Sequence, residues 1–415
     1  MSTHQTAIVL LDLALIIIAA TLLGRVARRL GQPPVIGELA TGILLGPMVL
    51  GPQLSGALFP SDVRPLLGIL GTFGLALFMF TVGLDLSHRR EKPSGGRAAS
   101  VISLASVALP FGLGAALAVL ISTNHAVENK LAFALFLGTA MSVTAFPVLA
   151  RIITDHGLQH TTVGKLAMTC AAVDDVCAWC LLTVVTIVAG MDQPSQAMTI
   201  LLAIPFLLAV VLVFRPVLRR LLGGRSATPT ITCALLVCAL SSAAFTEWIG
   251  LHFIFGAFIV GVAIPTSGFE EQREVLKRWI GPSTALLLPV FFTMSGLKVD
   301  LGTLGPNGFV ELSLILGVAV AGKFGGAWIA ARLTRHSSRD SVALAALVNT
   351  RGLTELIVLS VGLELMIIDQ AIYSTMVVMA LATTAMAGPV LRLLRLPGQK
   401  TGEFLVSREV SEFSV

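Results

Sequence analysis

Long apolar runs separated by short polar stretches occupy almost the whole chain. Thirteen such segments lie near residues 6–24, 33–50, 65–86, 98–121, 131–150, 163–190, 196–214, 228–246, 250–265, 279–297, 308–331, 340–363 and 370–391. An apolar helix needs ~20 residues to cross a bilayer, and most of these runs approach that length. The runs are continuous rather than alternating, which favours helices over barrel strands. The pattern predicts an all-α polytopic membrane protein with 13 transmembrane helices.

Basic residues indicate which ends of these segments face the cytoplasm. Of the 28 Lys and Arg residues, 23 follow odd-numbered segments, as Arg25, Arg28 and Arg29 follow the first. Cytoplasmic loops carry the excess of Lys and Arg. We therefore expect a multi-pass protein of the plasma membrane with its N-terminus outside and its C-terminus in the cytoplasm. Residues 1–395 form the membrane domain, and 396–415 form a short cytoplasmic tail without a soluble regulatory domain.

Composition excludes several classes of function. Charged residues make up 12% of the chain and hydrophobic residues 55%, whereas soluble domains carry about 25% charged residues. The net charge of +5 comes from basic loops, so we expect the lipid bilayer as a partner and no nucleic acid. The sequence shows no glycine-rich phosphate loop, no nucleophile–base pattern and no metal-ligand spacing of His. We expect no enzyme activity, no catalytic residue and no cofactor.

Among the ionisable residues inside the apolar segments, five are candidates for one shared site. Asp174 and Asp175 are adjacent in segment six, Lys323 lies in segment eleven, and Arg351 and Glu355 lie in segment twelve. Each such residue costs about 3 kcal/mol on insertion scales and more in simulations. They can compensate one another by facing a shared interior. Because intramembrane acids mark ion pathways, the adjacent pair predicts a cation or proton site.

A weak internal repeat relates the two halves of the chain. The Gly37–Gly42 motif of segment two recurs as Gly256–Gly261 in segment nine, at an offset of 219 residues. Gly83 of segment three corresponds to Gly296 of segment ten, at an offset of 213. Both matches shift the chain by seven segments, and an odd shift reverses the orientation in the membrane. Inverted repeats of this kind are typical of transporters, with the substrate site at their interface.

The same shift pairs two interrupted segments, five and twelve. Pro147 blocks regular hydrogen bonding in segment five, where Ser142 and Thr144 supply oxygens for a cation. In segment twelve, Arg351 and Glu355 are four residues apart and can pair to support the break. Paired breaks indicate the binding site of a transporter. We therefore predict that both segments are discontinuous helices.

Five stretches together resemble the monovalent cation:proton antiporter-2 family over essentially the whole chain. They are Pro33–Pro47, Leu77–Asp85, Ser142–Arg151, Ala172–Trp179 and Asn349–Ile357. The resemblance implies the sodium/proton antiporter-like fold, in which two discontinuous helices cross beside the aspartates. It also implies a mobile core domain, a scaffold domain that forms a homodimer, and alternating access.

The resemblance also implies domains and residue roles. It places the core, ion-transporting helices at about 65–190 and 279–363, and the scaffold helices at about 6–50, 196–265 and 370–391. Asp175 would bind the ion, and Asp174 would pair with Lys323. Two nearby carboxylates titrate as a coupled pair. A cation and protons would then compete for the same oxygens, which gives antiport.

The identity of the cation is left open between Na⁺ and K⁺. The Asp-Asp pair resembles bacterial sodium/proton antiporters, whereas the flanking residues resemble plant-type exchangers, several of which handle potassium. The proton stoichiometry is open between one and two per cation. Other readings are a transporter-like protein that serves a biosynthetic or resistance pathway, a channel, and an intramembrane aspartyl protease. The protease needs its two acids on separate helices, and here they are adjacent.

Overall fold

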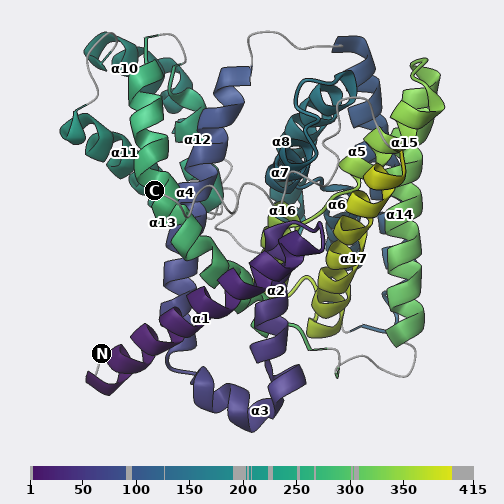
Figure 1. Ribbon diagram of the computed structural model, residues 1–415, viewed down its shortest axis with the longest axis horizontal. Coiled ribbons are helices and arrows are strands. Elements are labelled where there is room, and N and C mark those ends of the chain that lie inside the picture. The colour runs from purple at the N-terminus through teal and green to yellow at the C-terminus, as the bar shows by residue number, and fades with distance from the viewer. Residues whose placement is uncertain are drawn as a thin grey trace.

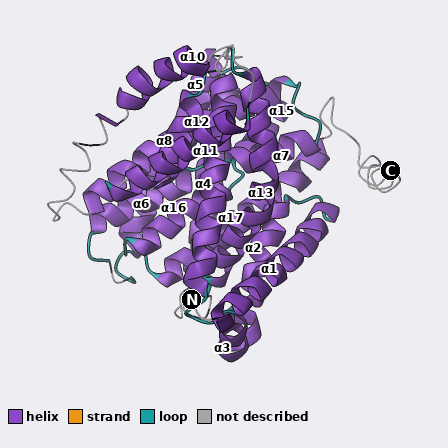
Figure 2. Cartoon of the chain, turned by 90° about the vertical axis from the view of Figure 1, so that its left-hand side faces the viewer, coloured by secondary structure: helices purple, strands orange, loops and turns teal. Residues whose placement is uncertain are grey.

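The computed structural model describes residues 3–89, 96–125, 127–189, 202, 205–206, 208–222, 228–249, 253–265, 268–300, 302 and 308–394. Within these residues the secondary structure is helical, and no strand occurs (Figure 2). Eight of the described helices are long and apolar enough to cross a membrane, and one bent pair makes a ninth if it is counted as one span. An all-α polytopic membrane protein is confirmed.

The helices pack as two groups, which lie largely on the left and right of Figure 1. The first group holds α1 (Thr3–Arg29), α2 (Pro34–Leu45), α3 (Pro47–Leu58), α4 (Arg64–Arg89), η1 (Val210–Phe214), α10 (Arg215–Leu222), α11 (Pro229–Trp248), α12 (Phe253–Ala263) and α13 (Glu270–Leu297). The second holds α5 (Gly96–Ile121), α6 (Lys130–Ser142), α7 (Phe146–Asp155), α8 (Thr162–Ala189), α14 (Gly308–Leu333), α15 (Ser338–Val348), α16 (Leu353–Glu364) and α17 (Gln370–Leu394).

This packing groups three helices otherwise than the resemblance implies, and the division into core and scaffold domains stays a prediction. The segments from residues 65 and 279 were expected with the core, yet α4 and α13 pack against α12, α2 and one another. The last segment was expected with the scaffold, yet α17 packs against α14, α15 and α16. Apolar length reports that a helix crosses the membrane, but not which neighbour it meets. Small residues that allow close approach decide the partner.

Three expected segments are bent or interrupted. The run 33–50 divides into α2 and α3, which meet at 66°. The reason is Gly46, which is extended, followed by Pro47, which begins α3 and lacks the N–H that would continue α2. The runs 131–150 and 340–363 divide into α6 and α7 and into α15 and α16. The expected segment 196–214 is described only in part, and the tail 396–415 lies outside the described residues.

Four glycines join the two related parts of the first group. A Cβ atom at Gly42 of α2 would lie 2.7 Å from the Cα of Gly296 in α13. A Cβ atom at Gly261 of α12 would lie 3.1 Å from the Cα of Gly83 in α4. The motif in each half therefore contacts the glycine motif of the other half, so that α2 packs on α13 and α12 packs on α4.

A second pair of contacts follows the same offset. Gly37 of α2 packs against the backbone of Leu23 in α1, and Gly256 of α12 packs against the backbone of Ser242 in α11. Gly256 follows Gly37 by 219 positions, and Ser242 follows Leu23 by the same 219 positions. The hairpins α1–α2 and α11–α12 thus share one way of packing, and glycine is needed in each because backbone fills the space of a Cβ atom.

His125 joins three elements of the second group at the end where α5 finishes. Its Nδ1 lies 2.7 Å from Asp369 Oδ2, and its Nε2 lies 3.2 Å from Glu311 Oε2. Asp369 also accepts the backbone N–H of Ile372 in the first turn of α17, and Asn124 donates to Glu311. The hydrogen bond with Asp369, opposed by burial and reinforced by both carboxylate charges, raises the pKa of His125. Through these contacts the His125 side chain links the α5–α6 turn to α14 and α17.

Replacing this histidine should cost stability mainly in acid. A raised pKa stabilises the fold fully below the unfolded value of about 6.5, and that contribution is lost as the pH rises through the folded value. At pH 5–6, His125→Gln should therefore have a lower melting temperature than the wild type. This difference in melting temperature should become smaller in alkali. Thermal melting in detergent across pH measures it, with His4→Gln as the control. A difference that widens with rising pH would contradict this role of His125.

Candidate functional site

Two broken helices meet in the middle of the second group. Helix α6 ends at Ser142, and Val143 is extended before α7 begins at Phe146. Helix α15 ends at Val348, and α16 begins at Leu353. The two breaks are joined, because the N–H of Ala145 donates to the carbonyl of Thr350 at 3.1 Å. Backbone that leaves both helices finds partners inside the protein, as a membrane interior requires.

Two buried cations cover the C-terminal end of α6. Arg351 donates from Nη1 to the carbonyl of Ala140 at 3.0 Å and from Nη2 to that of Met141 at 2.7 Å. Lys323 Nζ donates to the carbonyl of Ser142. The last carbonyls of a helix have no partner within the helix and carry its negative dipole end. Arg351 and Lys323 satisfy both needs at this break.

Arg351 also forms the ion pair expected from its spacing to Glu355. The guanidinium Nη1 lies 3.2 Å from Glu355 Oε1, and both side chains are fully buried. Glu355 stands in the first turn of α16, where the helix dipole favours an acid. The pair therefore connects the start of α16 to the end of α6. The Arg351–Glu355 pair therefore supports the break between α6 and α7 as well as the break between α15 and α16.

Asp174 is held on all sides by donors. Ser103 Oγ and Thr144 Oγ1 each donate to its carboxylate at 2.6 Å, and Ser106 Oγ lies at 3.2 Å. Lys323 Nζ lies 3.1 Å away, and both charged side chains are fully buried. A buried carboxylate with an ammonium and several hydroxyl donors is well compensated. This arrangement holds the Asp174 side chain in one position.

Asp175 has fewer and weaker contacts in the described part of the chain. Thr354 Oγ1 of α16 donates to it at 3.3 Å, and the backbone N–H of Phe146, at the start of α7, also faces it. Asp175 is 7% exposed, against 1% for Asp174. The two acids are neighbours in sequence but differ in environment. Of the two carboxyl groups, Asp175 can therefore change the group it binds while breaking fewer contacts.

The predicted site residues are arranged as follows. Asp174, Lys323 and Thr144 come together. Ser142 contributes its backbone carbonyl, while its hydroxyl donates to Thr139 within α6 at 2.8 Å. Pro147 lies in the first turn of α7 and so begins the second half-helix, where proline is well tolerated.

Sequence reasoning missed three polar residues of the site. Ser103 and Ser106 reach Asp174 from α5, and Thr354 reaches Asp175 from α16. A signal for the serines was present, because they are three residues apart and therefore share one face of an otherwise apolar helix. Thr354 lies inside the interrupted segment but was not singled out. A search for hydroxyl residues at helical spacing in apolar runs would find Ser103 and Ser106 but not Thr354.

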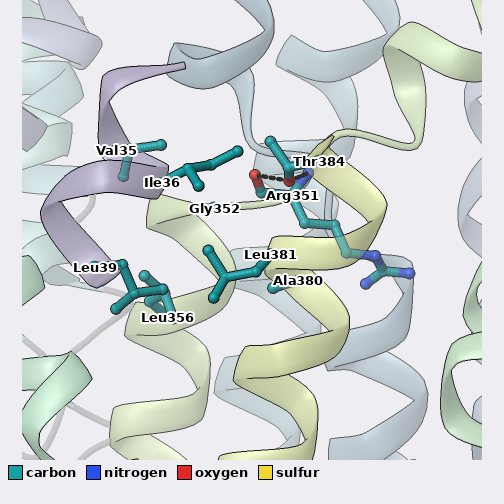
Figure 3. Close-up of a pocket in the computed structure, with 9 residues that line it drawn as sticks. All are labelled: Val35, Ile36, Leu39, Arg351, Gly352, Leu356, Ala380, Leu381 and Thr384. Atoms are coloured by element: carbon teal, nitrogen blue, oxygen red, sulfur yellow. Dashed lines mark hydrogen bonds between the residues drawn. The ribbon is translucent and has the colours of Figure 1, made fainter. Parts of the chain in front are cut away.

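A small apolar pocket separates this site from the first group of helices. Val35, Ile36 and Leu39 of α2 face Leu356 of α16 and residues of α17 across it (Figure 3). Beside the pocket, Thr384 of α17 hydrogen-bonds the backbone of Arg351, whose guanidinium points away from α2. The two helix groups thus meet through apolar surface directly beside the broken helices. Hydrogen bonds join the groups elsewhere, since Tyr373 of α17 donates to the carbonyl of Ser295 in α13 at 3.0 Å, and Gln32 donates to the carbonyl of Ala385 in α17 at 3.1 Å.

Comparison with known proteins agrees with this architecture. The family described as sodium/hydrogen exchanger, transmembrane, matches residues 14–395, and the chain belongs to that family. A solved sodium proton antiporter, MjNhaP1 from Methanocaldococcus jannaschii, superposes with a TM-score of 0.67 at 15% identity, over 94% of this chain and 100% of that one. At that identity the likeness shows the fold alone.

Curated relatives include proteins of bacteria and plants. The Na⁺/H⁺ antiporter NhaS4 of Synechocystis sp. is 39% identical over 404 residues, which cover 94% of this chain and 97% of the relative. The cation/H⁺ antiporter 17 of Arabidopsis thaliana is 34% identical over 95% of this chain and 49% of the relative. The chain spans about half the length of that plant relative.

Proposed function

We propose that the protein is a secondary active transporter that exchanges a monovalent cation, Na⁺ or K⁺, for protons by alternating access. The observation that carries the proposal is the contrast between Asp174 and Asp175 beside two joined helix breaks. Asp174 is surrounded by hydroxyl donors and Lys323, whereas Asp175 has few partners in the described residues. Membership of the sodium/hydrogen exchanger family supports the same reaction.

In this mechanism a cation and a proton compete for Asp175. Thr354 and the N-terminus of α7 help to hold the ionised carboxylate. A cation that binds there displaces the proton, and protonation releases the cation. Thr144 and the carbonyls around the breaks are placed to complete the oxygen ligands of a cation. The negative charge that attracts the cation would be that of ionised Asp175, because Lys323 offsets the charge of Asp174.

The transport domains that we propose follow the observed packing. The second helix group, with the broken helices, would carry the ion, and the first would form the scaffold and the homodimer contact. The glycine contacts at offsets of 219 and 213 support an inverted repeat, and with it 13 spans. The N-terminus would lie outside the plasma membrane and the C-terminus in the cytoplasm.

Reconstitution into liposomes tests the exchange. With an internal pH dye, an inward gradient of Na⁺, K⁺, Li⁺ or Rb⁺ should drive protons out at a rate that saturates with the cation. Relatives carry names with Na⁺/H⁺ and with K⁺/H⁺, so both ions belong in the series. Cation flux without coupled proton movement would indicate a channel and would refute the proposal.

Lys323 decides between two stoichiometries. If cation entry breaks the 3.1 Å pair of Lys323 with Asp174, a second proton can move in each cycle and exchange becomes electrogenic. Lys323→Gln should then reduce or abolish the voltage dependence while sparing some exchange. The potential is set by a thiocyanate gradient, which disturbs neither cation, and Na⁺-driven proton movement is followed. A wild-type rate indifferent to the potential would rule out the two-proton scheme.

A further inference from the structure

A small apolar cluster lies in the first helix group, away from the transport site. We call it the outer cluster, and its buried members come from α1, the α3–α4 region and α13. They are Val9, Ile16, Phe59, Val63, Leu67, Val290 and Leu297. Asp12 stands three residues after Val9 and four before Ile16, so it lies on the face of α1 that forms this cluster. It is 5% exposed.

Three buried oxygens around this cluster have no hydrogen-bond partner in the described part of the chain. They are Asp12 Oδ2, Ser55 Oγ and Thr293 Oγ1. Ser55 precedes the cluster residue Phe59 by four positions, and Thr293 lies between Val290 and Leu297 at the spacing of one helical face. Unsatisfied buried oxygens are rare in proteins, and three on adjoining faces call for an explanation.

No base in the described residues compensates Asp12. The outer cluster and the partly buried residues packed on it are all apolar. The basic residues at the neighbouring helix ends have other contacts: Arg64 Nε donates to the carbonyl of Phe59 at 2.8 Å, and Lys298 Nζ lies 3.9 Å from Glu364. An ionised Asp12 would therefore be an uncompensated charge in an apolar region of a membrane protein, which is very costly.

We propose that Asp12 is a second proton-binding carboxyl group of the chain, separate from the transport site, and a reaction site for apolar carbodiimides. Protonation removes the negative charge of the Asp12 carboxylate and needs no cavity for a bound ion or molecule. It also gives the carboxyl group a donor, which an ionised carboxylate lacks. Leu10 and Leu11 beside Asp12 are 61% and 70% exposed, so α1 presents apolar surface to an apolar reagent next to the site.

The reaction with a carbodiimide requires the neutral acid and releases no group. The acid proton passes to one nitrogen of the reagent, and the carboxyl oxygen bonds to the central carbon to give an O-acylisourea. Where water is scarce, the acyl group migrates to nitrogen and leaves a stable N-acylurea. An ionised aspartate at the aqueous surface lacks that proton. The apolar reagent therefore distinguishes the proposed state of Asp12 from the state of an exposed acid.

The experiment uses the full chain with Asp175→Asn, so that the transport carboxyl does not compete for reagent. Dicyclohexylcarbodiimide should modify Asp12, read by peptide mass spectrometry, and a water-soluble carbodiimide should not. Asp62, which is exposed and accepts a hydrogen bond from Gln5, is the internal control and should stay unmodified. Infrared spectra should show the carbonyl band of a protonated carboxyl that Asp12→Asn removes and Asp62→Asn keeps.

Three results would overturn the proposal. The first is the absence of both the Asp12 adduct and the infrared band. The second is protection of Asp12 by Na⁺ or K⁺ in the Asp175→Asn chain, which would make the occupant a cation. The third is loss of exchange in an otherwise wild-type chain carrying Asp12→Asn that melts normally, which would place Asp12 in the transport path. Asp12→Leu should fold and exchange as the wild type does, because the outer cluster is apolar.

Discussion

Asp175→Asn should reduce cation-driven proton movement in proteoliposomes to the rate of protein-free liposomes. The amide keeps the shape of the side chain and can still accept from Thr354, but it neither takes up a proton nor carries charge. The surrounding structure gives little reason for misfolding, because Asp175 supports few contacts in the described residues. The variant should therefore elute as a folded protein and melt close to the wild type.

Two comparisons sharpen this expectation. Asp62→Asn changes an exposed acid of the same kind and should keep full exchange. Asp174→Asn should lose exchange and stability together, because it disrupts a cage of three hydroxyls and the partner of Lys323. A folded Asp175→Asn protein with near wild-type exchange would refute the assignment of the ion-binding acid.

Arg351→Ala should lower the stability of the protein by about 3–5 kcal/mol, the usual cost of breaking a buried ion pair by removing one partner. The loss has two parts. The carbonyls of Ala140 and Met141 lose their donors at the end of α6, and Glu355 is left as a buried acid without its cation. Exchange should fall as well, since both breaks lose their support. Melting in detergent measures the first effect and the liposome assay the second.

A double-mutant cycle separates the two parts. Arg351→Ala with Glu355→Gln removes the unpaired acid, so the double variant should recover some of the melting temperature lost by the single one. Lys277→Ala breaks the partly exposed pair with Asp85 and should cost little, as surface pairs do. If Arg351→Ala melted normally but altered the preference among cations, Arg351 would belong to the ion site and not to its support.

The fold could be predicted from the sequence as far as apolar length and charge carry information. Long apolar runs predicted the helical membrane class, and paired interruptions predicted where the helices break. The same signals could not assign α4, α13 and α17 to their groups. That choice depends on contacts such as Gly83 with Gly261, which a single sequence does not report. The exact position of a break was also beyond reach, because Pro147 lies in the first turn of α7, which begins at Phe146, instead of in the gap before it.

For the site, rarity was the useful signal. Charged residues in apolar runs are few, so Asp174, Asp175, Lys323, Arg351 and Glu355 could be selected without knowing their neighbours. Hydroxyl residues are common in membrane helices, and many bond only to their own helix, so the shared helix face of Ser103 and Ser106 is a weak signal by itself. Their role depends on tertiary structure that brings α5 against α8.

The contact of Gly42 with Gly296 has a consequence for how the protein is made. The two residues are 254 positions apart, and at synthesis rates of 5–20 residues per second the ribosome needs roughly 13–50 s to travel between them. During that time α2 has been inserted but its partner α13 does not exist. Until α13 is made, the glycine face of α2 contacts lipid or another helix. Assembly of the first helix group is therefore a late event, completed after most of the chain has entered the membrane.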